Sequence, residues 1–146
     1  MAFQPDPDRI VWRLHLAASP ERVFAAIDSA EGRAGFWAEE AVEEDGVITF
    51  SFPGGETWRG AVVVREPPSR WGVEYFGSVA EFHLESDGSG GTDLTLVDTG
   101  VAPDHRTEVA AGWLNVLLPL KAWVDHGVDL RNHDPRRTWA HGYVDQ

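Results

Sequence analysis

The sequence contains no cysteine. This absence excludes disulfide bonds, thiolate nucleophiles and cysteine-ligated zinc or iron–sulfur sites, so any chemistry must come from oxygen and nitrogen groups. Basic residues are also scarce, because 12 Lys and Arg stand against 24 Asp and Glu and give a net charge of −12. Phosphate backbones and anionic lipids are bound by clustered Lys and Arg, so neither nucleic acid nor a membrane is an expected partner.

Long hydrophobic runs are missing as well. The longest nearly apolar stretch, 109–120, contains Asn115 and Pro119 and is shorter than the roughly 20 residues that a spanning helix needs. Residues 1–8 lack the basic and apolar regions of a secretion signal, so the cytoplasm is the expected compartment. The 146 residues, 42% of them hydrophobic, are enough for a single domain over 1–146 with a substantial core.

The first patterned segment predicts a strand followed by two short helices. Apolar and polar side chains alternate over residues 10–16, as in a strand with one buried face. Ser19, Pro20 and Glu21 then supply an N-cap hydroxyl, a proline at the first helical position and an acid in the first turn. A helix is therefore expected to begin there, and a second, glycine-interrupted helical turn is expected over residues 30–36.

The middle of the chain predicts short antiparallel strands. Turn residues recur at short intervals between alternating segments, at 45–46 (Asp-Gly), 53–55 (Pro-Gly-Gly) and 86–91, which is the longest flexible turn. Aromatic residues occupy many of the inward positions of these strands. About six strands are therefore expected between Trp37 and Gly100.

The strongest helical pattern follows. Asp104 or Thr107 is expected to cap a long helix, and Gly127 to end it. Pro119 lies inside the pattern, where it removes the amide partner of one carbonyl. The apolar positions recur at three- and four-residue steps and suit a helix that covers a sheet. They are Val109, Trp113, Val116, Leu117, Leu120, Trp123 and Val124.

This order of elements predicts an α+β domain in which a curved antiparallel sheet of about seven strands wraps around the long C-terminal helix. Three segments, 18–27 (ASPERVFAAI), 35–37 (GFW) and 112–114 (GWL), occur in the order and spacing of a known family. The chain resembles the START-like (SRPBCC, Bet v 1-like) superfamily of helix-grip folds, in the branch of activator of heat-shock-protein-90 ATPase homologues. The resemblance covers about 8–127 and leaves 128–146 as a polar extension.

The resemblance implies a cavity between sheet and helix that holds apolar small molecules. Large flat side chains on inward positions suit an apolar or aromatic ligand, although the same residues could equally form a bulky core. The extension could cover one end of the cavity or mediate self-association. The candidate cavity-lining residues are Trp37, Phe50, Trp58, Trp71, Tyr75, Phe82, Asp98, Trp113 and Leu117.

Polar candidates are few. Asp98 shares the inward parity of its strand, so its carboxylate either approaches the cavity or emerges at the strand end. The spacing of His126, His133 and His141 favours no metal site, and no pattern indicates a cofactor. The segment 131–137, rich in Arg, is expected to be a solvated tail or to bind an anion or a partner.

The leading hypothesis from the sequence is binding or sequestration of a hydrophobic small molecule in the cavity. Two alternatives stay open. The resemblance implies a co-chaperone-like interaction module, for which the partner would be a chaperone or a second copy of the chain. The other alternative is an enzyme, such as a cyclase or dehydratase acting on a polyketide-like chain, in which the cavity orients the substrate and Asp98 or Tyr75 would be the first choice for acid–base chemistry. The absence of a clear catalytic pair places the enzyme below the binding protein.

Overall fold

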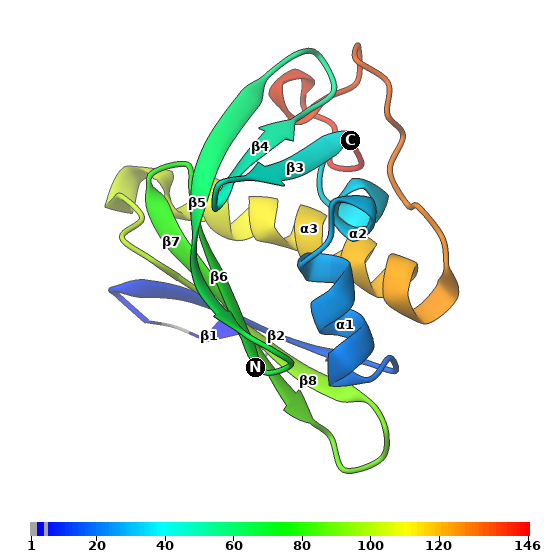
Figure 1. Ribbon diagram of the computed structural model, residues 1–146. Helices are drawn as coiled ribbons and strands as arrows, with labels where there is room; N and C mark the ends of the chain where they lie inside the picture. The colour runs from blue at the N-terminus through cyan, green and yellow to red at the C-terminus, as the bar shows by residue number, and fades with distance from the viewer. Residues whose placement is uncertain (1–2, 5) are drawn as a thin grey trace.

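One antiparallel sheet forms the framework of the computed structural model, which describes residues 3–4 and 6–146 and contains eight strands in the order β1-β2-β8-β7-β6-β5-β4-β3 (Figure 1). The first long strand therefore pairs with the last. A register shift between β5 and β6 at 62–64 introduces a local irregularity in the ladder, of a kind that bends strands. The strands are β1 (Phe3–Gln4), β2 (Arg9–Leu16), β3 (Glu40–Glu44), β4 (Val47–Ser51), β5 (Thr57–Glu66), β6 (Arg70–Tyr75), β7 (Ser78–Ser86) and β8 (Thr92–Thr99).

The helices gather on one side of this sheet (Figure 1). α1 (Pro20–Ile27) and α2 (Ala30–Phe36) follow β2, and the Ser19 side chain accepts a hydrogen bond from the Arg22 amide as the N-cap of α1. The long α3 (Arg106–His126) runs across the curved sheet. The predicted α+β helix-grip fold is confirmed, and among the described residues the short β1 brings the strands to eight rather than about seven.

The sequence predicts the C-terminal end of α3 correctly but not its N-terminal end. The predicted cap at Asp104 or Thr107 is wrong, because the N-cap residue is His105. A 3₁₀ turn, η1 (Pro103–His105), leads into the helix and provides its first turn of backbone hydrogen bonds. Gly127 ends the helix in the left-handed conformation, as predicted, and its amide donates to the Trp123 carbonyl at 3.0 Å.

The core lies between the concave face of the sheet and the three helices. Its largest fully buried side chains include Phe36, Phe50, Trp71 and Phe82. Trp37 lies at the centre of the aromatic cluster, with ring centroids 5.0 Å from Phe50 and 6.0 Å from Trp71. Within the described residues, no helix combines the length and the apolar character needed to cross a membrane.

The C-terminal segment, residues 128–146, packs back onto the domain (Figure 1). The expectation that 131–137 is a solvated tail is wrong for Arg131, which is buried. Its guanidinium donates to the carbonyls of Ala38 at 2.9 Å and Ala34 at 2.5 Å, at the end of α2. The buried arginine thereby gives both carbonyls a hydrogen-bond donor and holds the tail in place.

Candidate pocket between the sheet and the C-terminal helix

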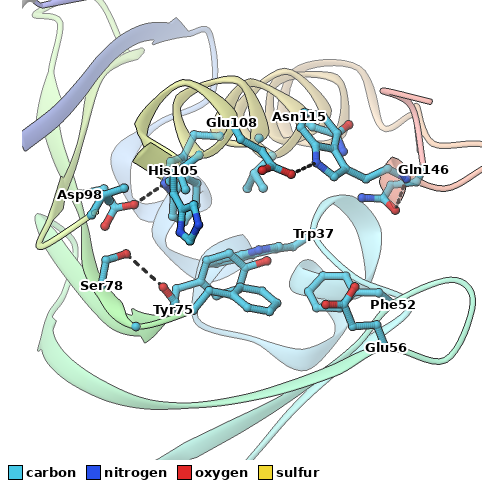
Figure 2. Close-up of a pocket in the computed structure, with 18 of the residues that line it drawn as sticks. Trp37, Phe52, Glu56, Tyr75, Ser78, Asp98, His105, Glu108, Asn115 and Gln146 are labelled. Carbon is cyan, nitrogen blue, oxygen red and sulfur yellow. Dashed lines mark hydrogen bonds between the residues drawn. The ribbon is translucent and has the colours of Figure 1, made fainter. Parts of the chain in front are cut away.

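A pocket of about 710 Å³ lies where the sheet curves away from the first half of α3. This volume is within the range of small-molecule pockets. Its walls come from the β6–β7 turn at 75–78, from the end of β8, from η1 and α3 between 105 and 116, and from tail residues 138–140 (Figure 2). Trp37 and the segment 52–56 complete the lining, so the pocket joins parts of the chain that are distant in sequence.

Three aromatic side chains form one continuous wall of the pocket. The ring centroid of Trp37 lies 5.3 Å from that of Tyr75 and 5.9 Å from that of Trp113, and the last two are 5.2 Å apart. All three pairs are tilted or edge-on, which is the arrangement that ring quadrupoles favour. Trp37 follows α2, Tyr75 ends β6 and Trp113 projects from α3, so the wall is built by the fold rather than by one element.

Asp98 is the buried acid of the pocket. Only 1% of its surface is exposed. Its Oδ2 accepts a 2.7 Å hydrogen bond from the Trp113 indole nitrogen, while its Oδ1 is buried and has no hydrogen-bond partner among the residues that the structure describes. Burial raises the pKa of Asp98, and the hydrogen bond from the Trp113 indole offsets only part of this increase.

Tyr75 and Trp37 add polar atoms to the aromatic wall. Burial raises the pKa of Tyr75, so the phenol keeps its proton and can donate at neutral pH. The Trp37 indole nitrogen is buried and has no hydrogen-bond partner in the described part of the chain. Ser78 lies beside them, and its hydroxyl donates to the Tyr75 carbonyl at 3.0 Å (Figure 2).

The rim of the pocket is aromatic and acidic. Phe76 is 48% exposed and has a positive φ of 47°, which is strained for an aromatic residue. Its ring stacks on Trp58, with centroids 4.9 Å apart. On the opposite side, Glu108 of α3 accepts a 3.2 Å hydrogen bond from the indole of Trp139 in the tail. The tail thus forms part of the rim.

The nine candidate residues have different positions. Four line the pocket: Trp37, Tyr75, Asp98 and Trp113. Four others are buried in the core and do not belong to the described pocket lining: Phe50, Trp71, Phe82 and Leu117. Trp58 is partly buried against Phe76, behind the rim.

Sequence reasoning missed several lining residues. Phe52 shares the alternating pattern of its strand and could have been found from it, whereas the contribution of Phe76 and Trp139 depends on a turn and on the tail. No three His, Asp or Glu side chains gather so as to hold a metal ion among residues 3–4 and 6–146. The arrangement offers an apolar wall, one buried acid and two neutral donors, which can bind and orient a ligand.

The fold is that of a helix-grip protein, and a pocket lies between its sheet and α3. Residues 17–125 match the family of activator of Hsp90 ATPase homolog 1-like proteins. This match spans most of the sequence, and the chain belongs to that family. No curated protein matches the chain significantly.

Solved structures share the fold. A protein from Staphylococcus saprophyticus superimposes with a TM-score of 0.73 at 22% identity, covering 84% of this chain and 96% of the other. The Aha1 dimer from Colwellia psychrerythraea gives 0.70 at 22% identity, with 82% and 97% covered. DynU16, from the dynemicin biosynthetic locus, gives 0.73 at 20% identity; the match covers 86% of this chain but 49% of DynU16.

Proposed function

We propose that this protein binds a hydrophobic small molecule in the pocket between the sheet and α3. The observation that carries the proposal is the 710 Å³ volume bounded by the aromatic wall of Trp37, Tyr75 and Trp113. Each Å² of apolar ligand surface that leaves water there contributes about 25 cal/mol to binding. The shared fold of DynU16, from a biosynthetic locus, also supports a small-molecule role.

Gly112 provides a direct test. It lies within α3 and lines the pocket, and a Cβ added to it would meet no described atom within 4 Å. Gly112→Leu should therefore fill the pocket without disturbing the core. We expect binding of the neutral fluorescent probe N-phenyl-1-naphthylamine, measured by fluorescence titration, to weaken at least about tenfold, which is about 1.4 kcal/mol.

The matched control is Gly112→Ala. Both substitutions remove a glycine from a helix interior and should stabilise the protein by about 1 kcal/mol, measured by thermal unfolding. Only the leucine side chain is large enough to occupy the pocket, so the alanine variant should retain probe binding. Equal affinity of the wild type and both variants would place the probe elsewhere, and failure of the wild type to bind any apolar probe would contradict the proposal.

A co-chaperone-like role is the second candidate, favoured by the family match and by the likeness to the Aha1 dimer. It would use the outer surface rather than the pocket. Addition of the protein to a purified Hsp90-type chaperone should then raise its ATPase rate, and Gly112→Leu should raise it equally. No change in that rate would count against this role.

An enzyme of the cyclase or dehydratase kind is a third candidate, favoured by the buried acid with a raised pKa in a small-molecule pocket. Asp98 or Tyr75 would then move a proton at a bound substrate. Turnover of a polyketide-like substrate that is unchanged in both Asp98→Asn and Tyr75→Phe would exclude these two residues.

A further inference from the structure

The charges around the pocket are predominantly negative. Asp98, Glu56 and Glu108 all belong to its lining. Two basic side chains, Arg131 and His105, also belong to the lining. The Arg131 guanidinium is already bound to Asp129 and to two backbone carbonyls, and His105 is exposed at the rim. An anionic ligand would therefore enter a pocket of like charge, whereas a cationic ligand would be attracted.

One carboxylate oxygen of the buried Asp98 lacks a hydrogen-bond donor among the described residues. Oδ2 is satisfied by Trp113, but Oδ1 is unpaired among the described residues, and the nearby Ser78 hydroxyl gives its proton to the Tyr75 carbonyl. A buried carboxylate oxygen without a hydrogen-bond partner is unfavourable, because it has lost its contact with water. A protonated amine carries up to three donors and a positive charge, so it would satisfy this oxygen and neutralise the acid.

The aromatic wall favours the same kind of group. Trp37, Tyr75 and Trp113 line the same pocket as Asp98, and the faces of such rings attract organic cations. An amine attached to a flat apolar body would place its nitrogen at Asp98 and its body against the rings. Figure 2 shows Asp98, Ser78 and Tyr75 along one side of the pocket, with the longer dimension of the site extending toward Phe52 and Gln146.

We propose that the ligand is a hydrophobic amine whose protonated nitrogen binds the free Oδ1 of Asp98. This inference rests on the proposed function and narrows it, because it makes Asp98 the residue that selects amines over alcohols and carboxylic acids. It assigns no bond-making step to the protein.

Three naphthalene probes of similar size and with the same ring system test the selectivity: 2-naphthylmethylamine, 2-naphthalenemethanol and 2-naphthoic acid. Their dissociation constants are measured by isothermal titration calorimetry at pH 7.5. We expect the amine to bind at least about tenfold more tightly than the alcohol, and the acid to bind most weakly of the three.

The Asp98→Asn variant should remove this preference. Asparagine keeps an oxygen for the Trp113 indole but loses the charge, so the amine should weaken at least about tenfold while the alcohol changes by less than about threefold. Asp93→Asn is the matched control, because Asp93 lies on the same strand, points to its other face and carries the same charge. This control should leave all three affinities unchanged.

The outcomes separate the two proposals. If none of the probes binds the wild type, the pocket function itself is wrong. If the probes bind with no preference for the amine, or if the preference persists in Asp98→Asn, the pocket function stands and the assignment to Asp98 is overturned. If both Asp98→Asn and Asp93→Asn weaken amine binding equally, the cause is the net charge of the protein, and the assignment to Asp98 is also overturned.

Discussion

Arg33 is the residue on which the junction between α1, α2 and β3 depends. Only 1% of it is exposed, and its guanidinium donates at 3.0 Å to the Ile27 carbonyl and at 3.0 Å to the Ala41 carbonyl. Burial lowers its pKa, while the nearby carboxylates of Glu43 and Asp28 favour the charged form. The buried arginine links the end of α1 to β3 through these two hydrogen bonds. Its removal would leave both carbonyl acceptors without a donor.

The Arg33→Met variant should therefore destabilise the protein. Methionine fills part of the same space but donates nothing, so we expect a loss of about 2–5 kcal/mol in the free energy of unfolding, measured by urea denaturation. Arg59→Met is the comparison, because Arg59 is an exposed arginine on β5. If the free energies of unfolding of the two variants differ by less than about 0.5 kcal/mol, the two hydrogen bonds of Arg33 do not stabilise this junction.

Residue positions in the pocket show what the sequence can and cannot predict. Alternation along a strand predicts which face a side chain occupies, and Trp71, Tyr75 and Phe82 are all on the inward face, as expected. Alternation does not predict whether an inward side chain lies in the packed core or in the pocket, because that depends on which helix covers it. Trp71 is fully buried beside the end of α1, where its indole donates a hydrogen bond to Asp28, whereas Tyr75 lines the pocket.

Among the elements, the C-terminal tail differs most from its sequence pattern. The caps at Ser19 and Gly127 are local features, and the sequence predicts them correctly. The position of the tail depends on contacts distant in sequence, such as Arg131 with the end of α2, and no periodicity reveals these. A run of Arg, Asp and His is therefore compatible with either a solvated or a docked segment.

His133 makes attachment of the tail depend on pH. Its Nε2 lies 2.6 Å from the Asp129 carboxylate, and its Nδ1 contacts Glu39, the residue before β3. Burial alone would lower the pKa of His133, but the hydrogen bonds to both carboxylates outweigh it and raise the pKa. Because the folded pKa is raised, this stabilisation is complete below about pH 6.5 and is lost as the pH rises through the raised value.

We expect the tail to loosen above neutral pH. Amide hydrogen exchange over 128–146, corrected for intrinsic rates, should accelerate between about pH 6 and about pH 9 relative to α3. His133→Asn is the control, since asparagine tolerates the positive φ of 57° at this position but does not titrate. The same acceleration in this variant would show that another group is responsible.

At the scale of the whole molecule, the excess of acids has a measurable consequence. Twelve basic side chains cannot pair with 24 carboxylates, and the remaining negative charges repel one another. Raising NaCl from about 10 mM to about 300 mM at pH 8 screens this repulsion and should raise Tm. A shift of about 2–4 °C would correspond to about 1 kcal/mol.

The same salt change near pH 5, close to the isoelectric point of about 4.7, is the control. The net charge is small there, so the effect of salt on Tm should nearly vanish. A fall in Tm with salt at pH 8 would indicate that surface ion pairs, such as Arg65 with Asp28 and Arg70 with Glu81, outweigh the repulsion.

The pocket is lined both by the segment that matches the family and by residues that follow it. The segment that matches the family ends at residue 125, and it supplies the aromatic wall and Asp98. Thr138, Trp139 and Ala140 belong to the chain beyond that match, yet they close one side of the same space. If the pocket binds a ligand as proposed, substitutions at these three positions would change the shape of the entrance while the aromatic wall and Asp98 stay in place.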